Sequence, residues 1–434
     1  MEITWGAVVA RRMRRHGLAA QSDTARSGAA RSGAAGFGGA GVGTAGVGTA
    51  ASGGAGVGTA GSAAARAGGA GVGTAGAGGV GVGGAFGSVV DAVRGMCGAH
   101  AQVAVAGEMS VALRVQGANR ETVQRDEGLV KTFGPRGTVH LLPLDDLPMW
   151  TGALSAIPAN GLQPEPIRMT PDEVDQVVVA IGEALAHEDL TVDELTEEVV
   201  RRTGEWARTP TIPAFQGAWA RWRQAVHVAA QAGVLCHGPL RGRLTTYSNP
   251  HRLRPFDPMP AEKALTELLH RYLYSYGPAT PQQFARWLKA TPTMVKPYFE
   301  ELPQATLADQ TVWYAPGDGD FPEDPVDGVR LLPYFDAYGV GSYPRELLFP
   351  GKAFERATAR GQAGNYPLLL VDGIVAGVWH QKKSGRTLHV TVEALTPLNR
   401  RRRKLLDAEV DRLGAILGVA PSLTLGDVTV GAHA

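Results

Sequence analysis

The chain lacks the residues that several classes of protein require. Only two of its 434 residues are cysteines, Cys97 and Cys236, and neither belongs to a CxxC or Cys/His pattern. A disulfide framework and a structural zinc site are therefore not expected. We predict a cytoplasmic protein with no bound metal and no other cofactor.

Long hydrophobic runs are also missing. The N-terminus has one apolar patch, residues 7–10, and it precedes a group of arginines instead of following them. This order is wrong for a secretory signal. A Gly/Ala-rich stretch is long enough to span a bilayer, but glycine disfavours a helix there. We expect no membrane association.

A net charge of one sign is absent as well. The 42 Lys and Arg residues almost balance 41 Asp and Glu residues. A uniformly basic, histone-like protein is excluded, so nucleic-acid binding requires charge that is segregated along the chain. A P-loop, the G-x-S-x-G and HExxH motifs, and a dinucleotide fingerprint in a strand-helix context are absent from the sequence too.

Glycine is abundant in one place. Residues 27–88 hold 25 of the 58 glycines and no acidic residue, and the string GAGVGTAG begins at residues 39, 54 and 69. A solenoid repeat must bury a hydrophobic stripe, and so few side chains cannot offset the entropy of ordering this backbone. We predict a disordered insertion within the first domain. A locally ordered or aggregation-prone element is the alternative.

Three segments repeat one order of predicted elements, namely helices followed by a β-hairpin. In the first segment, the pattern predicts helices at 3–17, 88–97 and 121–127 and a hairpin across 130–142. In the second, helices begin at Thr170 and Thr191, a third covers Phe215–Ala232, and strands follow at 234–236 and 243–247. In the third, the predicted helices are 262–274, one that begins at Thr280, and 294–301, before strands at 305–307 and 311–314. This layout is typical of the winged helix.

The C-terminal part differs from these three segments. Extended runs at 367–371, 374–380 and 388–393 are separated by Asp-Gly and Ser-Gly turns, and a helix is expected at 399–417. The predicted fold class is therefore α+β, with three tandem winged-helix domains, a C-terminal β-meander with a helix, and the insertion. The predicted boundaries are 1–26 with 89–165, 27–88, 166–258, 259–325 and 326–434.

Charge is sorted along this architecture. Residues 376–404 carry a net charge of +7, and residues 165–200 carry −10. A solvated helix face explains the acidic run. In the basic run, Lys382, Lys383 and Arg386 surround a predicted hairpin tip, where like charges repel unless an anion is bound. This arrangement favours contact with nucleic acid over a merely solvated surface.

A polar pair follows the second predicted helix, in the string Gly98-Ala99-His100-Ala101-Gln102. His100 and Gln102 are two residues apart, so both can face one side of an extended segment. A satisfied core or capping pair is one interpretation. The other is a pair that handles water, since histidine accepts a proton near neutral pH and an amide orients by hydrogen bonding.

Several segments, in this order, resemble the AlkZ/YcaQ type of bacterial DNA glycosylase. They are the basic first helix 10–18, the loop 98–102, and the strings PRGTVHL (135–141), LPYFDAY (332–338), RELL (345–348) and VDGIVAGVW (371–379). In that family a catalytic Gln-aliphatic-Gln or Gln-aliphatic-Asp motif occupies the position of residues 100–102. His100 replaces the first Gln here, as in the His-bearing branch found among actinobacterial enzymes linked to DNA-alkylating natural products.

The resemblance implies a monofunctional DNA glycosylase that hydrolyses the N-glycosidic bond of bulky N7-alkylated guanine in duplex DNA. His100 and Gln102 would be catalytic, and the activity would serve base excision repair or self-resistance to a genotoxic natural product. DNA would be contacted by Arg11, Arg12, Arg15, Arg136, His140, Lys382, Lys383 and Arg386. We expect a monomer, associated with the nucleoid and without an obligate protein partner. A winged-helix regulator without catalysis, or a scaffold with a flexible spacer, remains an alternative.

Overall fold

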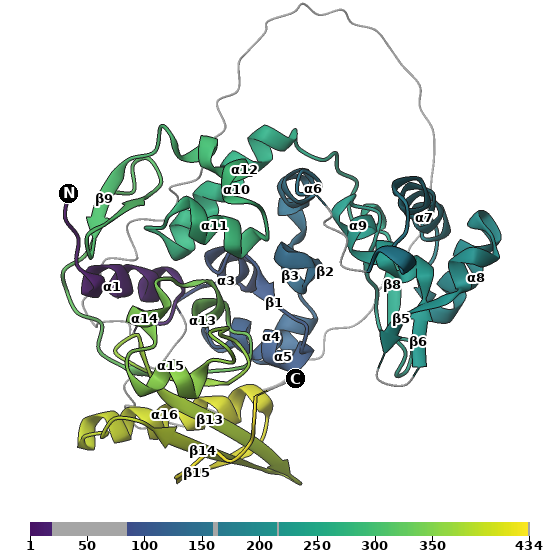
Figure 1. Cartoon of the computed structure of the whole chain (residues 1–434). Coiled ribbons are helices and arrows are strands. Elements are labelled where there is room, and N and C mark those ends of the chain that lie inside the picture. Colours follow the sequence, from purple (N-terminus) through teal and green to yellow (C-terminus); the bar gives the residue numbers. More distant parts are fainter. Residues whose placement is uncertain (20–84, 159–163, 215–216, 433–434) are drawn as a thin grey trace, which may run out of the picture. The chain divides into compact units, whose positions relative to one another are not determined.

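The protein has a mixed α+β fold. A computed structural model describes residues 1–19, 85–158, 164–214 and 217–432 (Figure 1). Within the chain, Met1–Ala20 and Val82–Ala434 form one compact unit. The predicted Gly/Ala insertion lies outside the described residues, except for its last four residues.

These four residues, 85–88, are folded. Phe86 forms a β-bridge with Val115, and its ring packs so closely on Gly95 that a Cβ there would lie 2.5 Å from it. The Ser88 side chain accepts a hydrogen bond from the Asp91 amide and caps the next helix. The last four residues of the predicted insertion are therefore part of the folded structure.

The first segment combines helices with a three-stranded sheet. Its helices are α1 (Trp5–Arg15), α3 (Val89–Gly95), α4 (Ala104–Ala112), α5 (Arg120–Gln124) and α6 (Leu147–Ser155). Its antiparallel sheet has the order β1 (Ala99–His100), β3 (Val139–Pro143), β2 (Leu129–Phe133). The hairpin and the three helices predicted for this segment are confirmed.

Helices α4 and α6 were not predicted. In α4, the N-cap residue Val103 makes no side-chain cap hydrogen bond, and Glu108 is its one charged residue. Its sequence therefore has neither a start signal nor a polar face with helical period.

The second segment begins with two helices, α7 (Pro171–Ala184) and α8 (Val192–Thr203), each with a capping box at its predicted start. A three-stranded sheet has the order β4 (Leu190–Thr191), β8 (Thr246–Ser248), β7 (Cys236–His237). A separate hairpin pairs β5 (Pro210–Ala214) with β6 (Gly217–Ala220), and α9 covers Val226–Gln231.

The predicted helix over Phe215–Ala232 is wrong in its first half. Gly217 has a φ of +94°, which a right-handed helix does not allow, and it pairs with Ala214 in the β5–β6 hairpin. A 3₁₀ turn over Arg221–Ala225 then leads into α9. The alanines between residues 214 and 232 favour a helix, but the left-handed conformation of Gly217 is that of a hairpin turn.

The third segment follows its prediction, except that the helix predicted over 294–301 ends at Val295 and continues as a 3₁₀ turn over Lys296–Phe299. It contains α10 (Ala261–Tyr276), α11 (Pro281–Leu288), α12 (Pro292–Val295) and the hairpin of β9 (Gln304–Leu307) and β10 (Gln310–Trp313). Helix α11 begins at the predicted position, with a capping box of Thr280 and Gln283.

The C-terminal segment is built on a five-stranded sheet. In order, its strands are β11 (Val329–Leu332), β12 (Leu368–Val371), β13 (Ile374–Ser384), β14 (Thr387–Ala394) and β15 (Ala420–Leu425). Its helices are α13 (Ala337–Gly341), α14 (Arg345–Leu348), α15 (Lys352–Ala357) and α16 (Arg400–Leu417). The predicted meander of β12–β14 and the helix α16 are confirmed. Strand β15, which pairs parallel with β14 after α16, was not predicted.

The first and the C-terminal segments share one hydrophobic core. Val93 of α3 and Met109 of α4 belong to the same buried cluster as Leu331, Trp379 and Leu413. Residues that are more than 200 positions apart in sequence are thereby held at fixed distances, which positions the site described next.

Candidate active site

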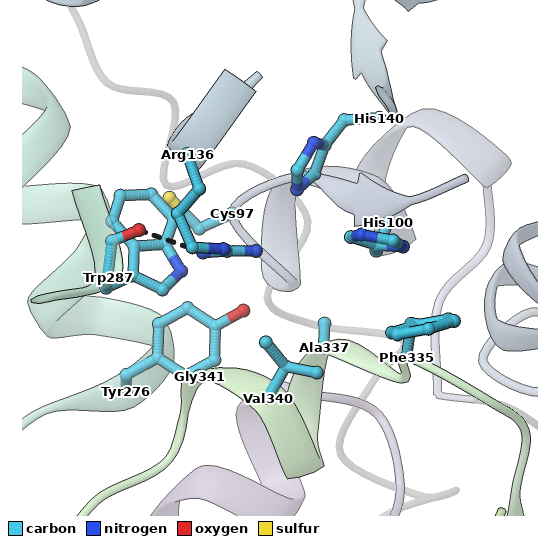
Figure 2. Close-up of a pocket in the computed structure, with 11 residues that line it drawn as sticks. Cys97, His100, Arg136, His140, Tyr276, Trp287, Phe335, Ala337, Val340 and Gly341 are labelled. Carbon is cyan, nitrogen blue, oxygen red and sulfur yellow. Dashed lines mark hydrogen bonds between the residues drawn. The ribbon is translucent and has the colours of Figure 1, made fainter. Parts of the chain in front are cut away.

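A small recess lies where the β1–β3 sheet meets the loop before α13 (Figure 2). It has room for about one water molecule. The residues that line it come from the first, third and C-terminal segments: Cys97, Gly98, His100, Arg136, His140, Tyr276, Trp287, Phe335, Ala337, Val340 and Gly341.

His100 is held by the sheet and by α4. It pairs with His140 across β1 and β3, and the next amide, of Ala101, donates to the Val139 carbonyl at 2.8 Å. Gly107 of α4 approaches β1 so closely that a Cβ would lie 2.7 Å from the His100 carbonyl oxygen. The short strand therefore ends at a tight crossing, which fixes the backbone of His100.

The His100 ring lies between two other rings (Figure 2). It stacks on Phe335 with centroids 4.8 Å apart and meets the edge of His140 at 5.2 Å. The residue is 9% exposed, and its Nδ1 has no hydrogen-bond partner among the described residues. Burial, and then the charge of Arg136, lowers the pKa of His100 to about 4. His100 is therefore neutral at pH 7 and can accept a hydrogen bond or a proton.

Phe335 is positioned by a buried ion pair. It has a left-handed backbone, with φ of +56°, and the following Asp336 binds Arg114 at 2.8 Å with both side chains fully buried. The Ser110 hydroxyl donates to the same carboxylate at 2.6 Å. Arg114 and Ser110 thus anchor the loop that places Phe335 against His100. The string LPYFDAY carried the family resemblance, but nothing in its residues indicated these contacts.

Arg136 reaches the recess from the loop between β2 and β3. It is half-buried, and its Nη1 donates to the Trp287 carbonyl at 2.8 Å. Burial lowers its pKa, but guanidinium still carries its charge at neutral pH. A cation therefore lies at the side of the recess, near the two histidines.

Gln102 does not line the recess. It is exposed in the turn before α4, and its Oε1 accepts a long hydrogen bond from the Val139 amide at 3.4 Å. The two residues of the predicted catalytic pair therefore differ in exposure, since His100 is buried and Gln102 is exposed. Gln102 is nevertheless hydrogen-bonded to Val139, the residue that precedes His140.

Three arginines of α1, Arg11, Arg12 and Arg15, are held by other groups of the protein. Arg11 and Arg12 are 2% and 1% exposed. Arg11 donates to the Asp320 carbonyl and pairs with Asp318, which also binds Arg15. Arg12 donates to three carbonyl oxygens, those of Gly277, Pro278 and Tyr343. The predicted DNA contacts of Arg11, Arg12 and Arg15 do not fit this structure, because Arg11 and Arg12 are buried and Arg15 is paired with Asp318.

His140 also differs from its prediction. It is 3% exposed and lines the recess beside His100, so its ring cannot reach a phosphate on the protein surface.

The tip of the β13–β14 hairpin, unlike Arg11, Arg12 and His140, carries exposed side chains. Lys382, Lys383 and Arg386 are all exposed around Gly385, which has a φ of +58°. Among the described residues, these three side chains form no hydrogen bond and no ion pair. We call this tip the basic hairpin.

Within the described ranges, three His, Cys, Asp or Glu side chains nowhere come close enough together to hold a metal ion. Both cysteines are free and buried. A search of the same ranges found no helix with the length and apolarity needed to cross a membrane.

Comparisons with known proteins bear on both the sequence and the fold. A sequence profile described as DNA glycosylase AlkZ-like matches residues 93–416. The interstrand DNA cross-link repair glycosylase of Streptomyces sahachiroi is 31% identical over 311 residues, which is 67% of this chain and 82% of that protein. The solved structure of the Streptomyces sahachiroi DNA glycosylase AlkZ gives a TM-score of 0.72 at 23% identity, covering 98% of this chain and 100% of that one. At this identity, the structural likeness concerns the fold.

Proposed function

The chain belongs to the AlkZ-like DNA glycosylase family, and from that premise we propose that it hydrolyses the N-glycosidic bond of bulky N7-alkylated guanines in duplex DNA. The observation that carries this proposal is a neutral, buried histidine, His100, in a recess with room for about one water molecule. Such a site suits the activation of water.

The chemistry demands little of the protein. Alkylation at N7 places a positive charge on guanine, which weakens the bond to the sugar and makes the base a good leaving group. The water oxygen forms a bond to C1′ while the C1′–N9 bond breaks. The electron pair of the C1′–N9 bond leaves with the base. The protein must position the water and accept one proton.

His100 is the proton acceptor in this proposal. Its ring is fixed by Phe335 and His140, and its low pKa keeps it unprotonated at neutral pH. Gln102 orients the water or the sugar from the exposed side of the same turn. An amide can do this by hydrogen bonding without changing its charge.

A covalent lysine mechanism is not favoured. Lys131 is the first lysine after the motif, and it pairs with Leu141 across the β2–β3 hairpin. The neighbouring pair, Thr132 and His140, lies in the row of His100. Because consecutive residues of a strand face opposite sides of a sheet, Lys131 faces away from His100. We therefore propose a monofunctional enzyme that leaves the DNA strand intact.

Binding to DNA is assigned to the exposed cations of the basic hairpin and to the half-buried Arg136. The basic hairpin would neutralise backbone phosphates, and Arg136 would contact a phosphate beside the lesion. The recess has no room for a purine, so a bulky adduct would stay outside it instead of entering a tight base pocket. This is why we include bulky adducts in the substrate class.

The wider context is proposed from the same premise. The three helix-and-hairpin segments would act as tandem winged helices along the duplex, with the domain boundaries given by the sequence. The relative named for interstrand cross-link repair supports a role in base excision repair or in self-resistance to a DNA-alkylating natural product. We propose that the protein acts as a monomer in the cytoplasm, at the nucleoid.

The test is a duplex with one bulky N7-alkylguanine at a defined position. We expect free modified base to appear in solution and the strand to break at that position only after heating or alkali. The variant His100→Ala should release no base above the spontaneous rate. His187→Ala is the matched control, because His187 is exposed in the turn after α7 and does not line the recess. Base release by His100→Ala at the wild-type rate would contradict the proposal.

A further inference from the structure

We propose that His140 is the second water-binding group of the active site, with its Nε2 accepting a hydrogen bond from the water that His100 activates. This inference rests on the proposed glycosylase function. It replaces the sequence-based expectation that His140 contacts DNA.

Placement is the first argument. His140 faces His100 across the β1–β3 pair, their ring centroids are 5.2 Å apart, and the interplanar angle is 72°. Both rings line the recess, and Figure 2 shows His140 directed into it between Arg136 and His100. A water molecule in the recess therefore has two imidazoles beside it.

The tautomer of His140 is the second argument. Its Nδ1 lies 2.8 Å from the Thr138 carbonyl oxygen, which can only accept a hydrogen bond. Nδ1 must therefore carry the proton, and Nε2 keeps its lone pair. Burial, with the nearby His100 and Arg136, lowers the pKa of His140 well below its ordinary value. The ring is thus a neutral acceptor on the side that can face water.

The turn that holds His140 is built around the ring. Gly134 donates from its amide to the same Thr138 carbonyl at 2.9 Å. A Cβ at Gly134 would lie 2.8 Å from Nδ1 of His140, so a glycine is needed to admit the imidazole. A mere surface histidine would not require such a fit.

In the attack of water on C1′, each of the two histidines interacts with one hydrogen of the water. As the water oxygen forms its bond to C1′ and the C1′–N9 bond breaks, one proton moves to a ring nitrogen of His100. The second hydrogen stays on the new hydroxyl group and points at Nε2 of His140 throughout. Two acceptors fix both hydrogens of the water, which leaves an oxygen lone pair for C1′.

Three substitutions separate this role from a structural one. His140→Gln keeps an acceptor near the position of Nε2 but loses the donor to Thr138. His140→Asn keeps a donor near the position of Nδ1 but has nothing at Nε2, and His140→Leu has neither group. The readouts are the single-turnover rate at saturating enzyme on a duplex with one N7-alkylguanine, the Kd for that duplex, and the melting temperature.

We expect His140→Gln to stay within about 10-fold of the wild-type rate and the Asn and Leu variants to lose about 10²-fold or more. The Kd should change by less than about twofold in all three, because a buried ring does not touch phosphate. The same substitutions of exposed His187 should leave all three readouts unchanged. A rate for His140→Asn equal to or above that of His140→Gln would overturn the inference, as would a weaker Kd with intact rates.

A second measurement does not depend on any variant or on activity. In ¹⁵N-histidine NMR spectra of the wild-type protein at pH 7, His140 should be neutral with its proton on Nδ1. A proton on Nε2, or a charged ring, would overturn the inference. If the wild-type protein released no base but His140 showed the expected tautomer, the proposed function alone would fail.

Discussion

The recess and the basic hairpin both concentrate polar side chains, but they differ in exposure. His100 and His140 are 9% and 3% exposed, and burial lowers the pKa of both, so they are neutral at pH 7. Lys382, Lys383 and Arg386 are exposed to solvent. Burial thus makes proton acceptors of the first group, and exposure makes phosphate ligands of the second. Chemistry and affinity should therefore be separable by mutation.

The largest effect is expected at His100. His100→Ala should reduce the single-turnover rate by about 10²- to 10⁴-fold, because the water loses its proton acceptor. The Kd for damaged duplex should stay near the wild-type value. If His100→Ala weakened DNA binding by the same factor as it lowered the rate, the recess and the basic hairpin would not have separate roles.

Gln102 provides a sharper version of the same test. Gln102→Ala should also lower the rate without changing the Kd. Its exposure makes the expected loss smaller than for His100→Ala, about 10²-fold. A fully active double variant of both residues would remove this site from the mechanism.

The arginines of α1 extend the comparison to buried cations. Arg12→Met leaves three carbonyl oxygens without their donor, so the free energy of unfolding should fall by about 3 kcal/mol. Below the melting transition, the salt dependence of DNA binding should not change. The free energies of unfolding of Arg12→Met and of the control Arg14→Met are compared by denaturant titration, since Arg14 is exposed. Equal stability of the two variants, with a flatter salt dependence for Arg12→Met, would restore Arg12 as a DNA-binding residue.

The basic hairpin should show the opposite behaviour. Replacing Lys382, Lys383 and Arg386 with Ala should weaken binding to damaged and undamaged duplexes alike. The slope of log Kd against log salt concentration should become less steep by about 0.9 for each phosphate that the protein no longer neutralises. The rate at saturating enzyme should change far less than in His100→Ala. With an unchanged slope, the tip would be an ordinary solvated turn.

The smallest effect is expected from pH. Since His100 is neutral above its pKa of about 4, kcat/KM should be nearly constant from about pH 6 to 8. It should fall as the pH approaches 4, because the ring then takes up a proton and can no longer accept one from water. Spontaneous release of base is subtracted at each pH. An acid limb centred near 6.5, the ordinary value for histidine, would show that burial does not tune this ring.

Local signals predicted much of the fold. The capping boxes at Thr170, Thr191 and Thr280 and the turns of the meander are contained within a few residues each, and the elements they start were predicted correctly. Helix α4 escaped prediction because it has neither a cap nor a polar face. The β5–β6 hairpin escaped because it depends on the conformation of Gly217.

The site was predicted less completely because its contacts are long-range. The sequence identified His100 by its motif but contained no sign of Phe335 as its stacking partner, more than 200 residues away. Charge alone made α1 and the basic hairpin look alike. Asp318 and the carbonyl of Tyr343, about 300 residues beyond α1, bind Arg11 and Arg12 and make these two arginines structural.

The central claim is that water, and not a lysine, displaces the base. Incubation of the enzyme with an N7-alkylguanine duplex in the presence of borohydride tests it most directly, since borohydride reduces a Schiff base to a stable protein–DNA adduct. We predict free modified base, an unbroken strand with an abasic site, and no adduct. A covalent adduct that maps to a lysine, or a strand broken before heating, would contradict the account.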